Sequence, residues 1–181
     1  MNKNLLIVGA GLYALVASEI AMDIGCFEKI AFIDDARTTT PNGITVIGTT
    51  QALTELSKDY SNIVVAIGNA NVRSSLLTYI RESSSYHIVS LISPKASVSP
   101  SARIAAGCII EPMAVVHTAC VLEEGCIVSA GAVINHASKC GACVHIDCNA
   151  TVSGYSFVPS GTKISSGEVF SNNIIKAEDL F

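Results

Sequence analysis

Two histidines in the second half of the chain, His136 and His145, are the side chains best suited to acid–base chemistry. An imidazole exchanges protons near neutral pH, so a histidine held outside a core can take a proton from an amine or a hydroxyl. His136 ends the sequence Val133-Ile-Asn-His136, and His145 lies between two apolar residues. A histidine at a surface can equally be a solvated side chain, so the surrounding sequence pattern must decide between the two interpretations.

The same region has a cluster of metal-ligand types. Cys140-x-x-Cys143 has a spacing found in zinc sites, and His136, His145 and Cys148 are near it. We predict that no metal binds there, because Cys140 falls at an inward position of the repeat described below. The remaining cysteines of the cluster fall on different faces of that repeat. A zinc site is the alternative.

A second set of candidate binding residues lies near the N-terminus. Gly9 and Gly11 follow an apolar run, where glycines let a strand-to-helix turn run tight and leave backbone N–H groups to hold a phosphate. The next apolar run ends in Asp34 and Asp35, whose carboxylates can accept hydrogen bonds from a ribose or a base. The other interpretation is that the two aspartates only end a strand at the surface.

The second half of the chain repeats every six residues. From Val98 to Ile164 every sixth residue is apolar, and the position four residues later is small or β-branched in every unit except the last, at Glu168. Six residues make one short strand and its turn, and three such units make a triangular coil, which predicts a parallel β-helix. A sandwich of alternating strands, the alternative, would show a period of two. The repeat places His136 outside the core, with Gly154 one coil above it leaving a shallow slot beside the imidazole.

The first half alternates apolar runs with stretches of helical spacing. Runs at 4–8, 29–33, 63–67 and 87–92 predict strands, and the spacing between them predicts a helix that ends near Gly25. A further helix is expected over 72–80. Strands that are apolar throughout indicate a parallel sheet covered on both faces. The expected fold is therefore α/β plus β, with a small Rossmann-like parallel α/β domain over residues 1–90 and a β-helix of hexapeptide repeats over residues 91–181.

Composition excludes several classes of protein. Half of the residues are hydrophobic and 14% are charged, which is too apolar for a disordered chain. No apolar run reaches the length of a membrane span. The net charge of −4 provides no basic surface for nucleic acid. The seven cysteines are an odd number, and no export signal is recognisable at the N-terminus, which favours reduced thiols and a cytoplasmic location.

Three segments in order resemble the bacterial sugar acyltransferases with hexapeptide repeats. This branch includes the sialic acid O-acetyltransferases and the acetyltransferases of nucleotide-linked amino sugars. The segments are Ile7-Val-Gly-Ala-Gly-Leu-Tyr-Ala14 with Phe32-Ile-Asp-Asp35, then Val65-Ala-Ile-Gly-Asn-Ala-Asn-Val-Arg73, and lastly Val133-Ile-Asn-His136 with Val144-His-Ile146. The resemblance covers nearly the whole chain. It implies a left-handed β-helix, acetyl-CoA as co-substrate, and a homotrimer with the coenzyme between neighbouring subunits.

The resemblance also implies which residues form the site. His136 would be the general base, with Asn135 beside it in catalysis. His145 would donate a ring N–H to the thioester carbonyl, and Gly154 would also lie on the acetyl-CoA side. No cysteine or serine nucleophile is needed if the acceptor attacks acetyl-CoA directly. The nucleotide sugar would be held by residues of the first half: Gly9, Gly11, Leu12, Tyr13, Asp34, Asp35, Gly68, Asn69 and Arg73.

The leading hypothesis is an acetyltransferase that moves acetyl from acetyl-CoA to an amine or hydroxyl of a nucleotide-linked sugar, as in surface glycan biosynthesis. The chain departs from the family pattern at three places. Tyr13 replaces an expected histidine, Ala137 replaces a carboxylate that commonly follows the catalytic histidine, and the repeat ends early. The tail residues Ile174, Ile175, Leu180 and Phe181 are then expected to cover the open prism end. The alternative is a non-catalytic scaffold or sugar-nucleotide-binding protein that retains the fold. A third hypothesis, an NAD-linked oxidoreductase, rests on the glycine turn alone.

Overall fold

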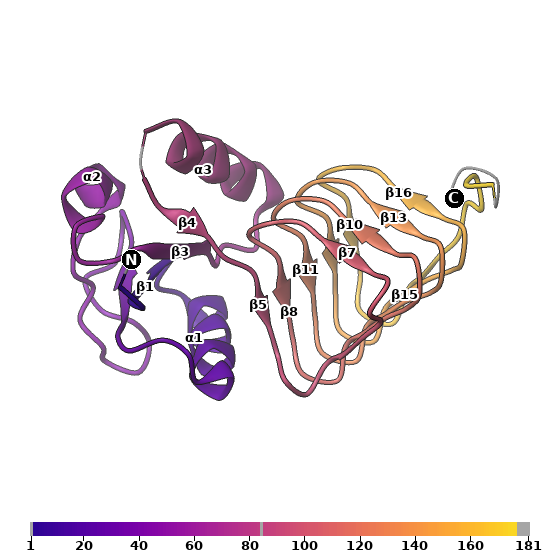
Figure 1. Ribbon diagram of the computed structural model, residues 1–181, viewed down its shortest axis with the longest axis horizontal. Coiled ribbons are helices and arrows are strands. Elements are labelled where there is room, and N and C mark those ends of the chain that lie inside the picture. Colours follow the sequence, from indigo (N-terminus) through magenta and orange to yellow (C-terminus); the bar gives the residue numbers. More distant parts are fainter. Residues whose placement is uncertain (1, 84, 177–181) are drawn as a thin grey trace. The chain divides into compact units, whose positions relative to one another are not determined.

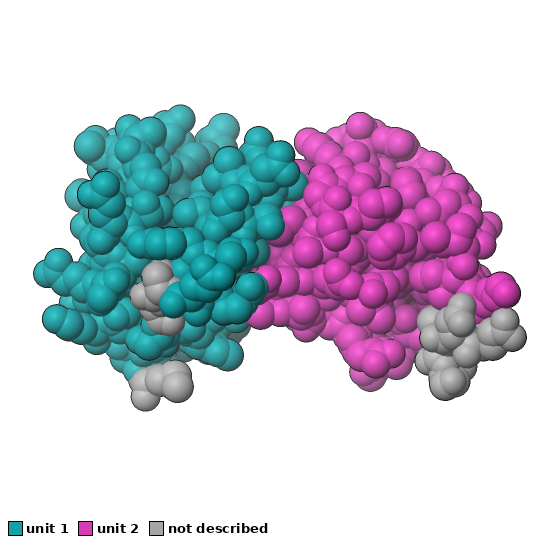
Figure 2. Space-filling model, turned by 90° about the horizontal axis from the view of Figure 1, so that it is seen from above, with its two compact units in different colours: residues 1–91 teal, residues 92–181 magenta. Residues whose placement is uncertain are grey.

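The computed structural model of the chain describes residues 2–83 and 85–176. It separates into two units, residues 1–91 and residues 92–181, which Figure 2 shows in different colours. The first unit has an α/β fold and the second is a parallel β-helix. This boundary lies one residue from the expected one, and each unit is described by itself below.

Four parallel strands form the sheet of the α/β unit, in the order β2-β1-β3-β4. Apart from Asn62 at the start of β3, the first three strands are apolar and almost entirely buried. Helices α1 and α3 lie on opposite sides of the sheet in Figure 1. The expected parallel sheet with two covered faces is therefore confirmed. The elements are β1 (Leu5–Val8), α1 (Leu12–Ile24), β2 (Ile30–Ile33), the 3-10 helix η1 (Thr50–Ala52), α2 (Leu53–Leu56), β3 (Asn62–Val65), α3 (Ala70–Ser83) and β4 (His87–Ile88).

The strand order reverses at β1. Strand β2 pairs with one side of β1 and β3 with the other, so the helices that follow β1 and β3 leave in opposite directions. Such a reversal opens a crevice beyond the carboxyl ends of the strands, where ligands bind in open α/β sheets. Helix α1 ends at Gly25, which has a φ of 70°. Helix α3 begins after Asn69, whose Oδ1 accepts a hydrogen bond from the N–H of Val72 at 3.1 Å.

The sequence prediction was wrong for parts of this unit. The expected strand at 87–92 is two strands, because β4 pairs with β3 whereas β5 (Leu91–Ile92) starts the β-helix. Strand β3 also ends at Val65, earlier than expected. The helices η1 and α2 were not predicted, because each is about one turn long and a single turn shows no periodicity.

Two-residue strands form the β-helix, and each pairs in parallel with the strand eighteen residues further on, as Val121 does with Lys139. Three faces result, named here the β12 face (β6, β9, β12, β15 and β18), the β13 face (β7, β10, β13 and β16) and the β14 face (β5, β8, β11, β14 and β17). The strands after β5 are Ser97–Val98, Arg103–Ile104, Ile109–Ile110, Val115–Val116, Val121–Leu122, Ile127–Val128, Val133–Ile134, Lys139–Cys140, His145–Ile146, Thr151–Val152, Phe157–Val158, Lys163–Ile164 and Val169–Phe170.

The period of six is confirmed by burial. The second residue of each strand is buried from Ile110 to Ile164, and the position four residues later is buried from Cys108 to Ser156. The corner between these positions carries a residue with positive φ, often glycine but also Ala119, at 58°, or Ala137, at 59°. Because a side chain disfavours this backbone region, small residues are favoured at most of these corners.

The buried cysteines are part of this repeat. The thiols of Cys120 and Cys126 donate to the carbonyls of Asn135 and Gly141 in the next coil, each at 3.1 Å. The hydroxyl of Ser138 makes the equivalent bond to Ser153 at 2.8 Å. Burial raises the pKa of Cys140 above its usual value. The cysteines act here as small apolar residues with a weak donor, and all seven are free thiols.

The C-terminal segment lies along one side of the β-helix. Phe170 extends the period by one unit and packs against the end of the apolar core. The Asn172 amide then bonds to both backbone groups of Phe157, accepting from its N–H at 2.9 Å and donating to its carbonyl at 2.7 Å. Ile174 and Ile175 line a pocket on the β13 face. The expectation that they cover the prism end was wrong, while Leu180 and Phe181 lie outside the described residues.

Candidate active site

His136 lies at the corner between β12 and β13 and is exposed. Its Nδ1 is 2.8 Å from Oδ1 of Asn135, and its ring meets the ring of Tyr155 edge-on, at 5.2 Å between centroids. Gly154 borders the other nitrogen: a Cβ at that position would be 3.1 Å from Nε2 of His136. The glycine therefore spares Nε2 the close contact that a side chain at position 154 would make, and Asn135 and Tyr155 contact the ring from two other directions.

A pocket of about 330 Å³ opens next to this corner on the β13 face. Ala137 and Ser138, which directly follow His136, line it together with Val121 and Phe157 from the strands. Its wall also includes two basic side chains, Arg103 and Lys139, and two apolar side chains, Ile174 and Ile175. Lys139 also pairs with Glu123, at 2.8 Å between Nζ and Oε1, so its charge is partly offset. The arrangement suits a long, mostly apolar ligand with a negatively charged group near Arg103.

His145 lies elsewhere on the β-helix. It is the outward residue of β14, and the β14 face closes the triangle opposite the corner that carries His136. Its Nε2 is 3.2 Å from Oγ of Ser129. The bond from Lys163 holds the pKa of Asp147 below its usual value, and the charge of His145 contributes in the same direction. One chain therefore does not bring the two predicted histidines together.

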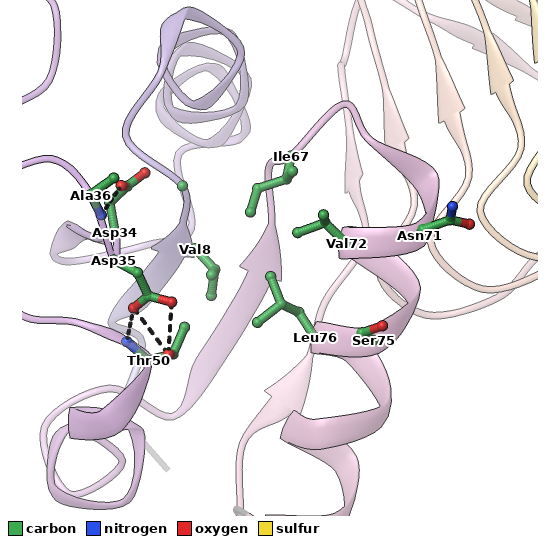
Figure 3. A pocket seen from close by; sticks show the side chains of 11 residues that line it. Val8, Asp34, Asp35, Ala36, Thr50, Ile67, Asn71, Val72, Ser75 and Leu76 are labelled. Carbon is green, nitrogen blue, oxygen red and sulfur yellow. Dashed lines mark hydrogen bonds between the residues drawn. The ribbon is translucent and has the colours of Figure 1, made fainter.

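The α/β unit contains a larger pocket, of about 540 Å³, at the carboxyl ends of β1, β2 and β3. In Figure 3, Ile67, Val72 and Leu76 form one wall of it, and Asp34, Asp35 and Thr50 lie on the opposite side. This is the crevice at which the strand order reverses. A ligand here would meet an apolar wall on one side and hydrogen-bonding groups on the other.

The two aspartates organise the loops around this pocket. Asp34 accepts hydrogen bonds from the N–H of Ala10, at 2.8 Å, and from the N–H groups of Ala36 and Arg37, each at 2.9 Å. Asp35 accepts from the N–H of Thr50 at 2.7 Å and contacts its hydroxyl at 3.0 Å. Both carboxylates thus have a structural task and also line the pocket.

The fold requires a glycine at only one of three glycine positions in this region. Gly9 has a φ of 112°, and a Cβ there would lie 2.9 Å from the carbonyl oxygen of Ala66, so the fold itself requires it. Gly11 has a φ of −84°, and no atom lies within 4 Å of a Cβ built on it or on Gly68. These two glycines leave bare backbone facing open space at the ends of β1 and β3.

Like Gly11 and Gly68, the remaining predicted binding residues lie outside the pocket lining. Arg73 is fully buried and donates to the carbonyls of Ile67 and Gly68 at 2.7 and 3.0 Å, so it holds the turn before α3. Leu12 is 73% exposed at the start of α1, and the Tyr13 hydroxyl is buried. Asn69 caps α3, as described above. Any effect of Arg73 or Asn69 on a ligand would act through the turn that they shape.

Several site residues were missed by the sequence prediction. Asn71, Val72, Ser75 and Leu76 line the α/β pocket from the first turns of α3, and Thr50 lines it from η1. Their spacing along α3 was visible in the sequence, but nothing in it indicated which helix face borders the crevice. Tyr155 was missed although it is eighteen residues after Ala137, which the period places one coil above.

Within residues 2–83 and 85–176, no group of His, Cys, Asp or Glu side chains is arranged to hold a metal ion. Among the same residues, no helix combines the length and the apolar character needed to cross a membrane.

Known proteins share this sequence and architecture. Residues 4–80 match the family model of the PglD N-terminal domain. The acetyltransferase domain of PglB from Neisseria gonorrhoeae FA1090 is 34% identical, with a TM-score of 0.90, and the match covers 95% of this chain and 84% of that chain. Its complex with acetyl coenzyme A has the same TM-score, 0.90, and identity, 34%, over 96% and 84% of the two chains. No curated protein sequence gives a match.

A more distant structure has the same fold. PerB from Caulobacter crescentus, in complex with CoA and GDP-perosamine, is 23% identical with a TM-score of 0.72, over 93% of this chain and 91% of that chain. The left-handed β-helix with a preceding α/β domain is thereby confirmed. The resemblance to hexapeptide-repeat sugar acyltransferases, which was drawn from three sequence segments, is also confirmed. The chain belongs to the family of hexapeptide-repeat sugar acetyltransferases.

Proposed function

We propose that this protein transfers acetyl from acetyl-CoA to an amine or hydroxyl of a nucleotide-linked sugar, with His136 as the general base. The observation that carries the proposal is the place of His136, an exposed imidazole whose Nε2 is not crowded by a methyl group at Gly154 and which directly precedes the pocket residues Ala137 and Ser138. An exposed base next to a binding pocket is the arrangement that direct acyl transfer needs. Membership of the family supports it.

The pocket on the β13 face suits the donor. The pantetheine arm of acetyl-CoA is long and carries phosphates at its far end, and the pocket offers Val121, Phe157 and Ile175 as apolar contacts with Arg103 and Lys139 as cations. The tail residues supply a wall that further coils would supply in a longer β-helix. The PglB acetyltransferase domain binds acetyl coenzyme A. We expect the thioester of bound acetyl-CoA to lie near the corner at His136.

The pocket of the α/β unit suits the nucleotide part of the acceptor. Asp35 in the lining offers a carboxylate to a ribose or a base. Gly11 and Gly68 lie outside the lining but close in sequence to its residues Gly9 and Ile67, and their bare backbone can approach a phosphate closely. The first unit would then be the sugar-nucleotide-binding domain and the second the acyltransferase domain. PerB, with the same fold, binds GDP-perosamine.

The residues define a simple mechanism. Bound acetyl-CoA supplies an acetyl group activated as a thioester. The acceptor nitrogen or oxygen attacks the thioester carbonyl carbon while Nε2 of His136 takes the acceptor proton. The carbon–sulfur bond then breaks, and His136 returns the proton to the departing thiolate. A ring N–H of His145 would stabilise the negative charge on the carbonyl oxygen. For His145 to donate from Nδ1, the Ser129 hydroxyl must donate to its Nε2.

A site that uses both histidines needs two chains, because they lie on opposite sides of one β-helix. The β12 face offers a surface for this association: its outward positions are uncharged, namely Ser97, Val115, Val133, Thr151 and Val169. Three copies with their β12 faces toward a common axis would bring His136 of one chain to the opposite edge of the next, beside β14. We therefore infer a homotrimer in which each active site is shared between neighbours.

The first test is acetyl transfer by the His136→Ala variant. We expect kcat to fall by about 10²–10⁴ while the KM for acetyl-CoA changes little, because the base acts on the transition state. Release of the CoA thiol gives the rate. His87→Ala, at an exposed position of β4, is the matched control and should keep full activity. Full activity of His136→Ala would reject the general base and favour a different mechanism.

The second test identifies the ligands. Melting temperatures measured with acetyl-CoA and with UDP-, GDP-, TDP- and CMP-sugars should rise with the true donor and acceptor, since ligands that bind the native state stabilise it. Binding of a nucleotide sugar with no acetyl transfer to any acceptor would support the non-catalytic alternative.

A further inference from the structure

The amide of Asn135 is the group that orients the imidazole of His136. Its Oδ1 accepts from the backbone N–H of His136 at 2.8 Å and lies 2.8 Å from Nδ1 of the same residue. A backbone N–H can only donate, so the amide atom that faces it must be the oxygen and not the nitrogen. The same oxygen contacts the ring, so Nδ1 must carry a proton and Nε2 must be the free lone pair.

We propose that Asn135 replaces the carboxylate that is missing at Ala137, as the positioning residue that fixes the catalytic tautomer of His136. The inference rests on the function proposed above. Ala137 has a φ of 59° and is 4% exposed, so its side chain has neither a favourable backbone for substitution nor the freedom to reach the ring. Asn135 acts from the other side of His136 in the chain.

The backbone around this pair is fixed from the neighbouring coils. The N–H of Asn135 donates to the carbonyl of Val152 at 2.9 Å, and the Asn135 carbonyl accepts from the thiol of Cys120 at 3.1 Å. The His136 carbonyl accepts from the N–H of Tyr155 at 3.1 Å. The backbone of both residues is thus fixed, and the two bonds to His136 hold the amide oxygen beside the ring.

An amide and a carboxylate orient a histidine equally well but differ in charge. A carboxylate stabilises the imidazolium, whereas a neutral amide fixes the tautomer without adding that stabilisation. The titratable neighbour in ring contact with His136 is Tyr155.

The deciding measurement is the tautomer of His136 in the wild-type protein. Two-bond ¹⁵N–¹H spectra of protein labelled at histidine distinguish the Nδ1–H from the Nε2–H form, and His136→Gln identifies the signal among the four histidines. We expect Nδ1–H in the wild type and its loss in Asn135→Ala. An Nε2–H form in the wild type, or an unchanged tautomer in Asn135→Ala, would overturn the proposal. This readout does not depend on activity, so it fails separately from the proposed function.

Kinetics of two variants complete the test. Asn135→Ala should lower kcat by about 10²-fold with little change in the KM for acetyl-CoA. Asn135→Asp should keep the Nδ1–H form and move the acidic limb of the kcat/KM profile up by about one pH unit, because the imidazolium gains an anionic partner. Should Asn135→Ala not fold, Asn135→Asp decides alone, and an unshifted acidic limb contradicts the proposal. Ser153→Ala, one coil above Asn135, is the matched control.

Discussion

A single methyl group at position 154 would crowd the imidazole of His136, the proposed base. The Cβ of Gly154→Ala would lie 3.1 Å from Nε2 and 3.2 Å from Cε1 of His136, so the ring must move away from its present place. We expect the rate of acetyl transfer to fall by about 10²-fold, since a small displacement of a catalytic group has a large effect. The φ of Gly154 is not positive, so the melting temperature should change little. A variant with full activity would show that Nε2 is not the reacting atom.

The turn after β1 allows two glycines of the same element to be compared. Gly9→Ala should destabilise the protein by about 2 kcal/mol or more, because it combines a φ of 112° with a clash against Ala66. Gly11→Ala should change stability by about 0.5 kcal/mol or less, because its backbone is extended and the space is open.

Nucleotide-sugar binding should respond differently from stability, because it should be weakened by Gly11→Ala, the variant that hardly affects stability. Gly11→Ala places a methyl group where we propose a phosphate approaches the backbone, so nucleotide-sugar binding should weaken in a fully folded variant. Urea unfolding and calorimetric titration separate the two effects. Unaltered affinity in Gly11→Ala would remove this turn from the proposed acceptor site.

The coils of the β-helix protect their thiols. Five cysteines are buried, Cys108, Cys120, Cys126, Cys140 and Cys143, while Cys26 and Cys148 are exposed. Burial raises the pKa of Cys120 and of Cys140, which keeps them in the unreactive thiol form. Labelling with a thiol reagent in native buffer should spare these five, and all seven should react in denaturant. Rapid native labelling of Cys140 would contradict the inward register of the repeat.

Elements whose hydrophobic residues recur at a regular spacing were predictable from the sequence. Individual side-chain hydrogen bonds between residues were not. The hexads placed Cys140, Ile146 and Gly154 correctly, because each coil repeats the same geometry every eighteen residues. The segment from 34 to 61 has no hydrophobic period, so the bonds of Asp35 to Thr50 had no visible signal. The bond between Asn135 and His136 depends on one rotamer at a corner, which composition and spacing do not determine. The tail was placed wrongly because the amide of Asn172 redirects it along the β13 face.

At the scale of the assembled molecule, mixed trimers test the shared site. His136→Ala and His145→Ala chains, each nearly inactive alone, should recover activity when they are unfolded and refolded together. If each site takes one histidine from each of two chains, random mixing restores both in about a quarter of the sites. Light scattering should report three times 18.8 kDa for every sample. No recovery in a mixed trimer would reject an active site built from His136 of one chain and His145 of another.

The amide of Asn172 has a consequence for solubility. The outermost strand of the β13 face, at Phe157, would otherwise present an unpaired N–H and C=O to solvent, and exposed strand edges template the addition of further chains. Asn172 occupies both groups, so that edge cannot serve as a growing end. The residue that directs the tail toward the pocket thus also acts as a stop against end-to-end polymerisation. Asn172→Ala should form higher-order species at concentrations where the wild type stays uniform in size.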